Sequence, residues 1–251
     1  MVIRILTPSS VFSVPMAQIS IGMLLCLARG IHSAHIDFTA GNELYGLEGN
    51  RESELISGSD IGFIGFGDLV KAIHKLLHGF SPGIRVFDSW LSKSFLLRKG
   101  VVFASIEEVL SKGRFVFVVS AVTEDNIGMI NSETLSLMQP GASLLLLYRV
   151  AIVDFVTMVN FADQDKIRLA TDVSPEEPLA LDHPIRNSPN VLLSAHRAGA
   201  LSSVLLKMED YVLEDQDLLD RGLPPQNYET AEPETVASLR IKPVEKVKIY
   251  E

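Results

Sequence analysis

The chain has 251 residues, of which 47% are hydrophobic and 21% charged; 31 acidic against 22 basic side chains give a formal net charge of −9. This apolar content excludes global disorder, and the length corresponds to one or two domains. The acidic balance argues against nucleic acid or an anionic membrane as a partner, because either needs a basic surface. The single Cys26 fits a reducing compartment, so we expect a soluble, cytoplasmic protein.

The segment 16–36 predicts one long helix with an apolar face wide enough to be buried against a second subunit or another lobe. Its apolar core, residues 19–28, is shorter than the roughly 20 residues that a bilayer span needs. The first ten residues, MVIRILTPSS, offer one arginine and a proline, which does not match the basic start, apolar stretch and cleavage site of a signal peptide. We therefore expect no membrane segment.

Short apolar runs alternate with helical stretches between residues 58 and 195. The runs are 60–65, 84–88, 114–119, 142–147, 167–171 and 191–194. They lack period-two alternation, which is typical of strands buried on both faces. One intervening helix begins at Ser105 with Glu108 three residues later, a capping-box pattern. The repeated strand–helix order predicts an α/β fold with a doubly wound parallel sheet.

A glycine-rich turn follows the first of these strands. Gly65 and Gly67 precede a helix that starts with Asp68 and Leu69. In a dinucleotide fold the first glycine allows the tight turn, the second admits the pyrophosphate, and the helix N-terminus faces the phosphates. The third position, where a glycine helps helix and strand to pack, is Val70. A turn that binds nothing, or S-adenosylmethionine as the ligand, remains an alternative.

Asp88 ends the next strand, 23 residues after Gly65. A carboxylate at this position accepts hydrogen bonds from ribose hydroxyls and repels a 2′-phosphate, which favours NAD over NADP. Trp90 could flank an adenine ring, but packing within the protein is the interpretation we adopt from the sequence.

Arg149 follows a strongly apolar strand, directly after Tyr148. Ligands bind at the carboxyl ends of the strands in an open α/β sheet. A guanidinium there suits a carboxylate substrate. The structural alternative is an ion pair with Asp154 or Glu177.

His196 follows the last strand of the alternation. Histidine titrates near neutral pH and suits proton exchange with a hydroxyl or carbonyl oxygen. The segment DVSPEEP supplies Asp172, Glu176 and Glu177 as candidate partners. A buried carboxylate touching the imidazole would fix its tautomer.

These motifs together resemble the D-isomer-specific 2-hydroxyacid dehydrogenase family (formate/glycerate dehydrogenase-like). The matching segments, in order and spacing, are IGFIGFGDLV, VFD, AVTEDNIGMIN, SLMQPGASLLLLYRVAIVD, TDVSPEEP and DHPIRNSPNVLLSAHRAGA. The resemblance implies that Arg149 binds the substrate carboxylate, that His196 is the general acid/base, and that Glu177 is its partner acid.

The resemblance also implies NAD as the cofactor. The implied cofactor-binding residues are Gly65, Gly67, Asp68, Leu69, Asp88, Ala121, Val122, Thr123, Tyr148, Asp172 and Gly199. No metal site is expected, because the histidine pairs at 32/35 and 74/78 lack a third ligand.

By this resemblance, residues 1–199 form an NAD-binding domain, 200–225 a helix returning toward the substrate lobe, and 226–251 an extended tail. We expect a flavodoxin-like substrate lobe that is truncated, and a homodimer formed through the 16–36 helix. The implied function is NAD-dependent hydride transfer between nicotinamide and a small 2-hydroxy or 2-oxo acid. The alternative is an inactive NAD(H)-binding module for dimerisation or regulation.

Overall fold

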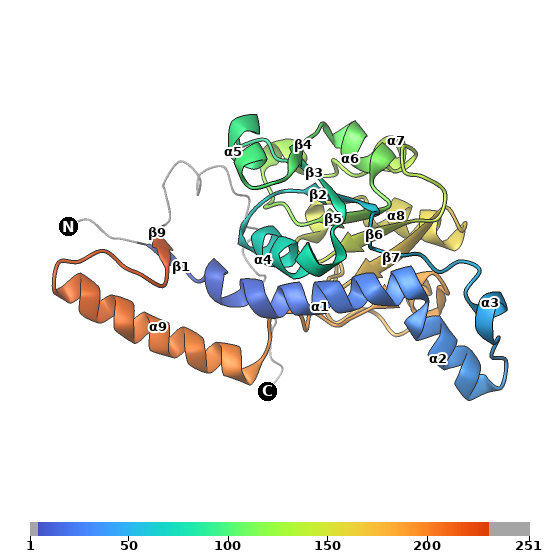
Figure 1. Cartoon of the computed structure of the whole chain (residues 1–251). Coiled ribbons are helices and arrows are strands. Elements are labelled where there is room, and N and C mark those ends of the chain that lie inside the picture. Colours follow the sequence, from blue (N-terminus) through green and yellow to red (C-terminus); the bar gives the residue numbers. More distant parts are fainter. Residues whose placement is uncertain (1–4, 231–251) are drawn as a thin grey trace.

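The computed structural model describes residues 5–230, which are built around a seven-stranded parallel sheet (Figure 1). The strand order is β4-β3-β2-β5-β6-β7-β8. The strands are β2 (Asp60–Ile64), β3 (Gly83–Phe87), β4 (Val102–Phe103), β5 (Phe115–Val118), β6 (Ala142–Leu146), β7 (Ile167–Thr171) and β8 (Val191–Leu193). The six predicted strands are confirmed, and the sheet is extended by the short edge strand β4, whose two residues are exposed.

Two hydrophobic cores lie on opposite faces of this sheet. In β5, Phe115 and Phe117 belong to one core, while Val116 and Val118 belong to the other. The first face is covered by α1 (Ser9–Arg29), α4 (Asp68–Leu77) and α5 (Lys93–Arg98). The second is covered by α6 (Ile106–Lys112), α7 (Ser132–Leu135) and α8 (Phe155–Asp163). The prediction of a doubly wound α/β sheet is therefore confirmed.

The ends of the helices follow local chemistry. At α6 the predicted capping box is present: Ser105 Oγ accepts from the Glu108 amide at 3.2 Å, and the Ser105 amide donates to Glu108 Oε2 at 3.3 Å. These bonds satisfy amide groups that have no partner inside the helix. Single 3₁₀ turns complete the connections: η1 (His78–Phe80), η2 (Glu124–Asn126), η3 (Val150–Ile152) and η4 (Pro184–Asn187).

The prediction of a single helix over residues 16–36 is wrong in one respect, because this segment forms parts of two helices. Gly30, with φ +60°, ends α1 and separates it from α2 (Ile31–Ala40). The short α3 (Gly46–Gly49) follows, and Figure 1 shows α2 and α3 projecting at one end of the molecule. No residue of α2 is buried.

The length argument against a membrane span does not hold for α1. Its stretch Ser10–Arg29 is long and apolar enough to cross a membrane by those two criteria, with 44% of the window buried. The helix packs along α4, however, and Ala17, Leu24 and Ala28 are fully buried in the core beneath it. It is thus a helix of the folded domain.

The C-terminal helix α9 (Ser202–Asp220) contacts α1 but extends away from the sheet (Figure 1). The buried Asp215 accepts hydrogen bonds from the amides of Gln226, Asn227 and Tyr228. Burial alone raises the pKa of the Asp215 carboxyl, but these hydrogen bonds outweigh that effect and hold the pKa below its usual range.

The same turn brings the two ends of the described chain together. The short strands β1 (Leu6–Thr7) and β9 (Glu229–Thr230) pair antiparallel as a second sheet. The expected tail begins within this turn and runs to residue 251; its part from 231 onward lies outside the described residues. The proposed domain boundaries stay a prediction.

Candidate active site

A cavity of about 770 Å³ opens at the carboxyl edge of the sheet. It is bounded by the segments that follow β2, β3, β5 and β6 and by one side of α1. The lining includes these residues from the expected cofactor set: Gly65, Gly67, Asp68, Leu69, Asp88, Ala121, Thr123 and Tyr148. Sequence motifs from four separate strand ends are thus brought to one site.

The glycine turn has the geometry that a pyrophosphate needs. Gly65 has φ +99°, and a Cβ there would lie 2.9 Å from Ser120 Cα, so only glycine fits. A Cβ on Gly67 would meet nothing within 4 Å, which leaves open space at the start of α4. Because Gly67 has no side chain to cap that helix, a ligand phosphate can approach the first-turn amides. NAD therefore fits this turn.

Val70 stands where the third glycine was expected, and it is completely buried in the core shared by α1 and α4. One turn into α4, Lys71 Nζ donates to Asp68 Oδ1 at 2.9 Å and also lines the cavity. Sequence reasoning missed Lys71, although its i,i+3 spacing from Asp68 is a signal for such a pair. The lysine offsets an acidic group at the phosphate end of the cavity.

Asp88 joins the two turns that border the cavity. Its Oδ2 accepts from the Phe66 amide at 2.9 Å, and its Oδ1 accepts from the amides of Trp90 at 2.9 Å and Leu91 at 3.0 Å. A carboxylate has about four lone-pair sites, two on each oxygen, so Oδ2 retains capacity for a ribose hydroxyl. The Asp88 carboxylate is therefore held in place before any ligand arrives.

His196 and Glu177 are in direct contact, with 2.7 Å between Nδ1 and Oε2. Of the three candidate acids, the structure pairs Glu177 with the imidazole. The Glu177 carboxylate is not buried, because the side chains of His196 and Glu177 are 57% and 37% exposed. With Nδ1 engaged, Nε2 is the ring nitrogen left for a substrate proton.

Asp172 is buried beneath the loop that carries His196. Its Oδ1 accepts from the Arg197 amide at 2.9 Å and its Oδ2 from the Ala198 amide at 3.0 Å, while its carbonyl accepts from the His196 amide at 2.8 Å. His196 itself has φ +52°, a conformation uncommon for a non-glycine residue. These bonds hold the histidine backbone in that conformation.

Arg149 forms neither of the ion pairs considered from the sequence. Asp154 instead caps α8 by accepting from the Thr157 amide and hydroxyl, and Glu177 contacts His196. Arg149 is exposed, and its Cζ lies 4.9 Å from the centre of the Tyr148 ring. Within residues 5–230 it has no carboxylate partner, so its guanidinium is available to a ligand.

Three expected cofactor residues do not line the cavity: Val122, Gly199 and the buried Asp172 described above. Val122 packs against the core on the α6–α8 face. Gly199 lies against α1, where a Cβ would be 3.0 Å from the Phe12 ring. The sequence also gave no signal for the α1 residues Phe12 and Met16, which do line the cavity. A role for Val122, Asp172 and Gly199 in cofactor binding stays a prediction.

Trp90 lines the cavity and is 55% exposed. The interpretation that it packs within the protein is therefore wrong.

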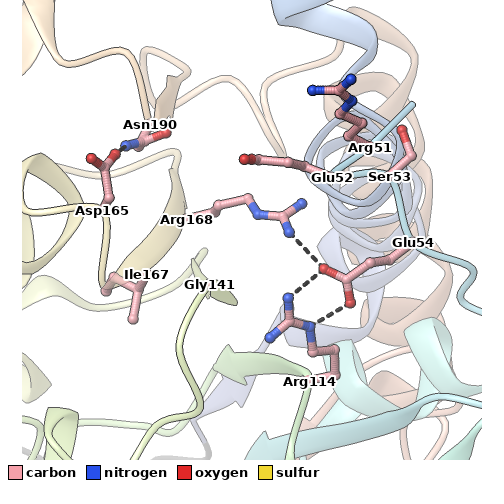
Figure 2. A pocket seen from close by; sticks show the side chains of 10 residues that line it. All are labelled: Arg51, Glu52, Ser53, Glu54, Arg114, Gly141, Asp165, Ile167, Arg168 and Asn190. Atoms are coloured by element: carbon pink, nitrogen blue, oxygen red, sulfur yellow. Dashed lines mark hydrogen bonds and ion pairs between the residues drawn. The ribbon is translucent and has the colours of Figure 1, made fainter. Parts of the chain in front are cut away.

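A second cavity, of about 570 Å³, lies at the opposite, amino edge of the sheet (Figure 2). Figure 2 shows the guanidinium groups of Arg114 and Arg168 converging on Glu54, which precedes β2. Both arginines also donate to backbone carbonyls, Arg114 to that of Pro140 and Arg168 to that of Leu27. These ion pairs and hydrogen bonds join the connection before β2 to the strands.

No cluster of three metal-ligating side chains occurs in the part of the chain that the structure describes. His74 lies on α4 and His78 begins η1; burial, and to a lesser extent the charge of His78, lowers the pKa of His74.

Comparison with known proteins agrees with this geometry. The sequence model of the family described as "D-isomer specific 2-hydroxyacid dehydrogenase, NAD binding domain" matches residues 21–198. The chain is 29% identical over 170 residues to a glyoxylate reductase of Pyrococcus furiosus, covering 67% of this chain and 50% of the relative. It is 24% identical over 218 residues to a D-3-phosphoglycerate dehydrogenase of Bacillus subtilis, covering 83% of this chain and 39% of the relative.

Among solved structures, a phosphoglycerate oxidoreductase from Rhizobium etli superimposes with a TM-score of 0.86 at 50% sequence identity. That alignment covers 91% of this chain and 70% of the other. Among the curated relatives, the chain spans about half the length of the glyoxylate reductase of Pyrococcus furiosus. The protein belongs to the D-isomer specific 2-hydroxyacid dehydrogenase family and contains its NAD-binding domain, with NAD as the cofactor.

Proposed function

We propose that the protein is an NAD-dependent oxidoreductase that interconverts a small 2-hydroxy acid and the corresponding 2-oxo acid. The observation that carries this proposal is the 2.7 Å contact between His196 and Glu177 at the sheet edge where the nucleotide cavity opens. A histidine oriented by a carboxylate is an arrangement suited to general acid/base catalysis.

When bound, the nicotinamide ring accepts or supplies the hydride. The residues of this chain handle the charge and the proton. Arg149 holds the substrate carboxylate, because it is exposed and has no acidic partner in the described chain. His196 gives or takes the hydroxyl proton at Nε2, and Glu177 stabilises the imidazole when it is protonated.

The cofactor preference we propose is NAD over NADP. Asp88 presents a fixed carboxylate at the adenosine end, where a 2′-phosphate would be repelled. The names of the relatives, glyoxylate reductase and D-3-phosphoglycerate dehydrogenase, support a small carboxylate as the substrate.

A second candidate function is an NAD(H)-binding module without turnover. The specific observation that favours it is the exposure of the His196–Glu177 pair, since hydride transfer is served by a site that excludes water. The turnover measurement below separates the two functions.

We also propose a cytoplasmic homodimer with neither a membrane nor nucleic acid as partner. The α2 helix supports the dimer, because Ile31, Ile36 and Phe38 are each at least half exposed. A second copy of the chain covering this face would remove that apolar surface from water. Light scattering of Phe38→Glu should then show a lower mass than the parent protein; an unchanged mass contradicts the dimer.

The activity is tested by titrating the chain with NADH and then adding glyoxylate or hydroxypyruvate to the same sample. Binding followed by oxidation of NADH supports the enzyme, and binding without oxidation supports the module. The variant His196→Ala is the control for turnover: it should still bind NADH, because the residues that line the nucleotide cavity are unchanged in it.

A further inference from the structure

The strand order assigns different halves of a dinucleotide to different sides of the cavity. β3 lies on one side of β2, whereas β5 to β8 lie on the other. Arg149 and His196, the groups suited to chemistry, follow β6 and β8. The adenosine half therefore belongs over the end of β3, where Asp88 and Trp90 line the cavity.

Trp90 is the single tryptophan of the chain, and more than half of its surface is exposed at that end of the cavity. Within residues 5–230 no aromatic ring or cation is paired with it. A large apolar ring left in water without a partner is a group that gains by covering a flat ligand.

The backbone of Trp90 is nevertheless fixed. Its amide donates to Asp88 Oδ1 at 2.9 Å, and Oδ2 of the same carboxylate reaches the Phe66 amide. Leu91 and Phe95 line the cavity next to it, and the segment 119–126 contributes lining residues from the neighbouring side of β2. The indole thus has a rigid attachment and an apolar surround.

We propose that Trp90 stacks on the adenine ring of the cofactor and makes affinity depend on that base. This inference rests on the proposed NAD-dependent function. Stacking on an aromatic side chain stabilises a bound base through its flat face, without base-specific hydrogen bonds. Trp90 is therefore a recognition residue, and it takes no part in hydride or proton transfer.

The test measures binding by calorimetry for the parent protein, Trp90→Ala and Trp90→Phe. The ligands are NADH, ADP-ribose, which lacks nicotinamide, and reduced nicotinamide mononucleotide, which lacks adenosine. Trp90→Ala should bind NADH and ADP-ribose about tenfold more weakly, because one stacking contact is lost. Trp90→Phe should stay within about threefold of the parent, since a smaller ring still stacks. Neither variant should change the affinity for the mononucleotide.

The native fluorescence gives an independent readout. ADP-ribose should quench Trp90 emission in the parent protein, and the mononucleotide should not. Unchanged ADP-ribose affinity in Trp90→Ala, or a parallel loss for the mononucleotide, overturns the role of Trp90. A parent protein that binds no NADH overturns it as well. A parent protein that binds NADH but oxidises none with a 2-oxo acid contradicts the proposed enzyme only, and leaves the stacking result to stand on its own.

Leu97→Ala is the matched control. Leu97 is 53% exposed but does not line the cavity, so its removal should leave all three affinities unchanged.

Discussion

Both edges of the central sheet carry arginines, but those at the amino edge are paired with a carboxylate and the one at the carboxyl edge is not. At the amino edge, Glu54 is paired with both Arg114 and Arg168, and each arginine also donates to a backbone carbonyl. At the carboxyl edge, Arg149 has no acidic partner in the described chain, and the imidazole of His196 keeps one nitrogen open. Charges satisfied within the protein serve the fold, whereas charges left open are available to a ligand.

The largest expected effect is on turnover at the carboxyl edge. His196→Ala should lower kcat about a thousandfold, because the proton donor at the substrate oxygen is lost. The affinity for NADH should stay nearly unchanged, since His196 does not line the nucleotide cavity. Steady-state kinetics and calorimetry check the two parts. His35→Ala, an exposed change on α2, should affect neither. Full activity in His196→Ala would remove it from the mechanism.

At the amino edge the expected effect is on stability. Glu54→Gln leaves two guanidinium groups without their carboxylate and should lower the free energy of unfolding by about 2 kcal/mol. Urea denaturation measures this change. Glu52→Gln is the control, because Glu52 lines the same cavity without an ion pair in the described chain. NADH affinity should not change in either variant.

This contribution should depend on pH. Burial alone raises the pKa of Glu54, but the hydrogen bonds and charges of Arg114 and Arg168 hold it below its usual 4.5. A carboxyl with a lowered folded-state pKa stabilises the protein above the unfolded pKa and loses that effect as the pH falls through the folded value. The difference in the free energy of unfolding between the parent protein and Glu54→Gln should therefore be largest near neutral pH and become smaller in acid. An equal difference at neutral and at acid pH would contradict its origin in the ion pairs.

A smaller effect is expected on cofactor choice. Asp88→Ala should weaken NADH binding about tenfold, because a hydrogen-bond acceptor for the ribose is removed. It should also narrow the preference for NADH over NADPH, because the repulsion of a 2′-phosphate is lost. Because Asp88 also accepts from the Phe66 amide, part of the loss should extend to the pyrophosphate turn. Asp125→Ala, in the same cavity lining, is the control. Unchanged affinity for both cofactors would exclude the ribose role.

The smallest expected effect lies away from both edges. Gly30 has φ +60° at the break between α1 and α2, so Gly30→Ala should destabilise the protein by about 1 kcal/mol. Gly22 lies inside α1 with open space around its missing Cβ, so Gly22→Ala should stabilise it by up to about 1 kcal/mol. Thermal melts of the two variants should shift in opposite directions. A shift in the same direction would contradict the backbone assignment at Gly30.

Local pattern was sufficient for the parallel sheet and for the groups at the strand ends, because buried strands and glycine turns depend on neighbouring residues. The capping box at Ser105 is predictable for the same reason. The break at Gly30 was missed because an isolated glycine inside an apolar helix is often tolerated.

Contacts between distant residues could not be predicted. Glu54 lies 60 residues from Arg114 and 114 from Arg168, and no spacing rule joins them. The same holds for Phe12, which reaches the cavity through the packing of α1. The exposure of Trp90 also depends on which distant segments pack near it, and this cannot be predicted from the neighbouring sequence.

The antiparallel pairing of Leu6 with Thr230 has a topological consequence. The chain enters and leaves the described fold at one corner, so residues 6 to 230 trace a nearly closed ring. The two ends can be joined by a short linker and the chain reopened elsewhere, for example in the loop 42–45 before α3. A circular permutant of this kind would retain both sheet edges while carrying its termini beside α3.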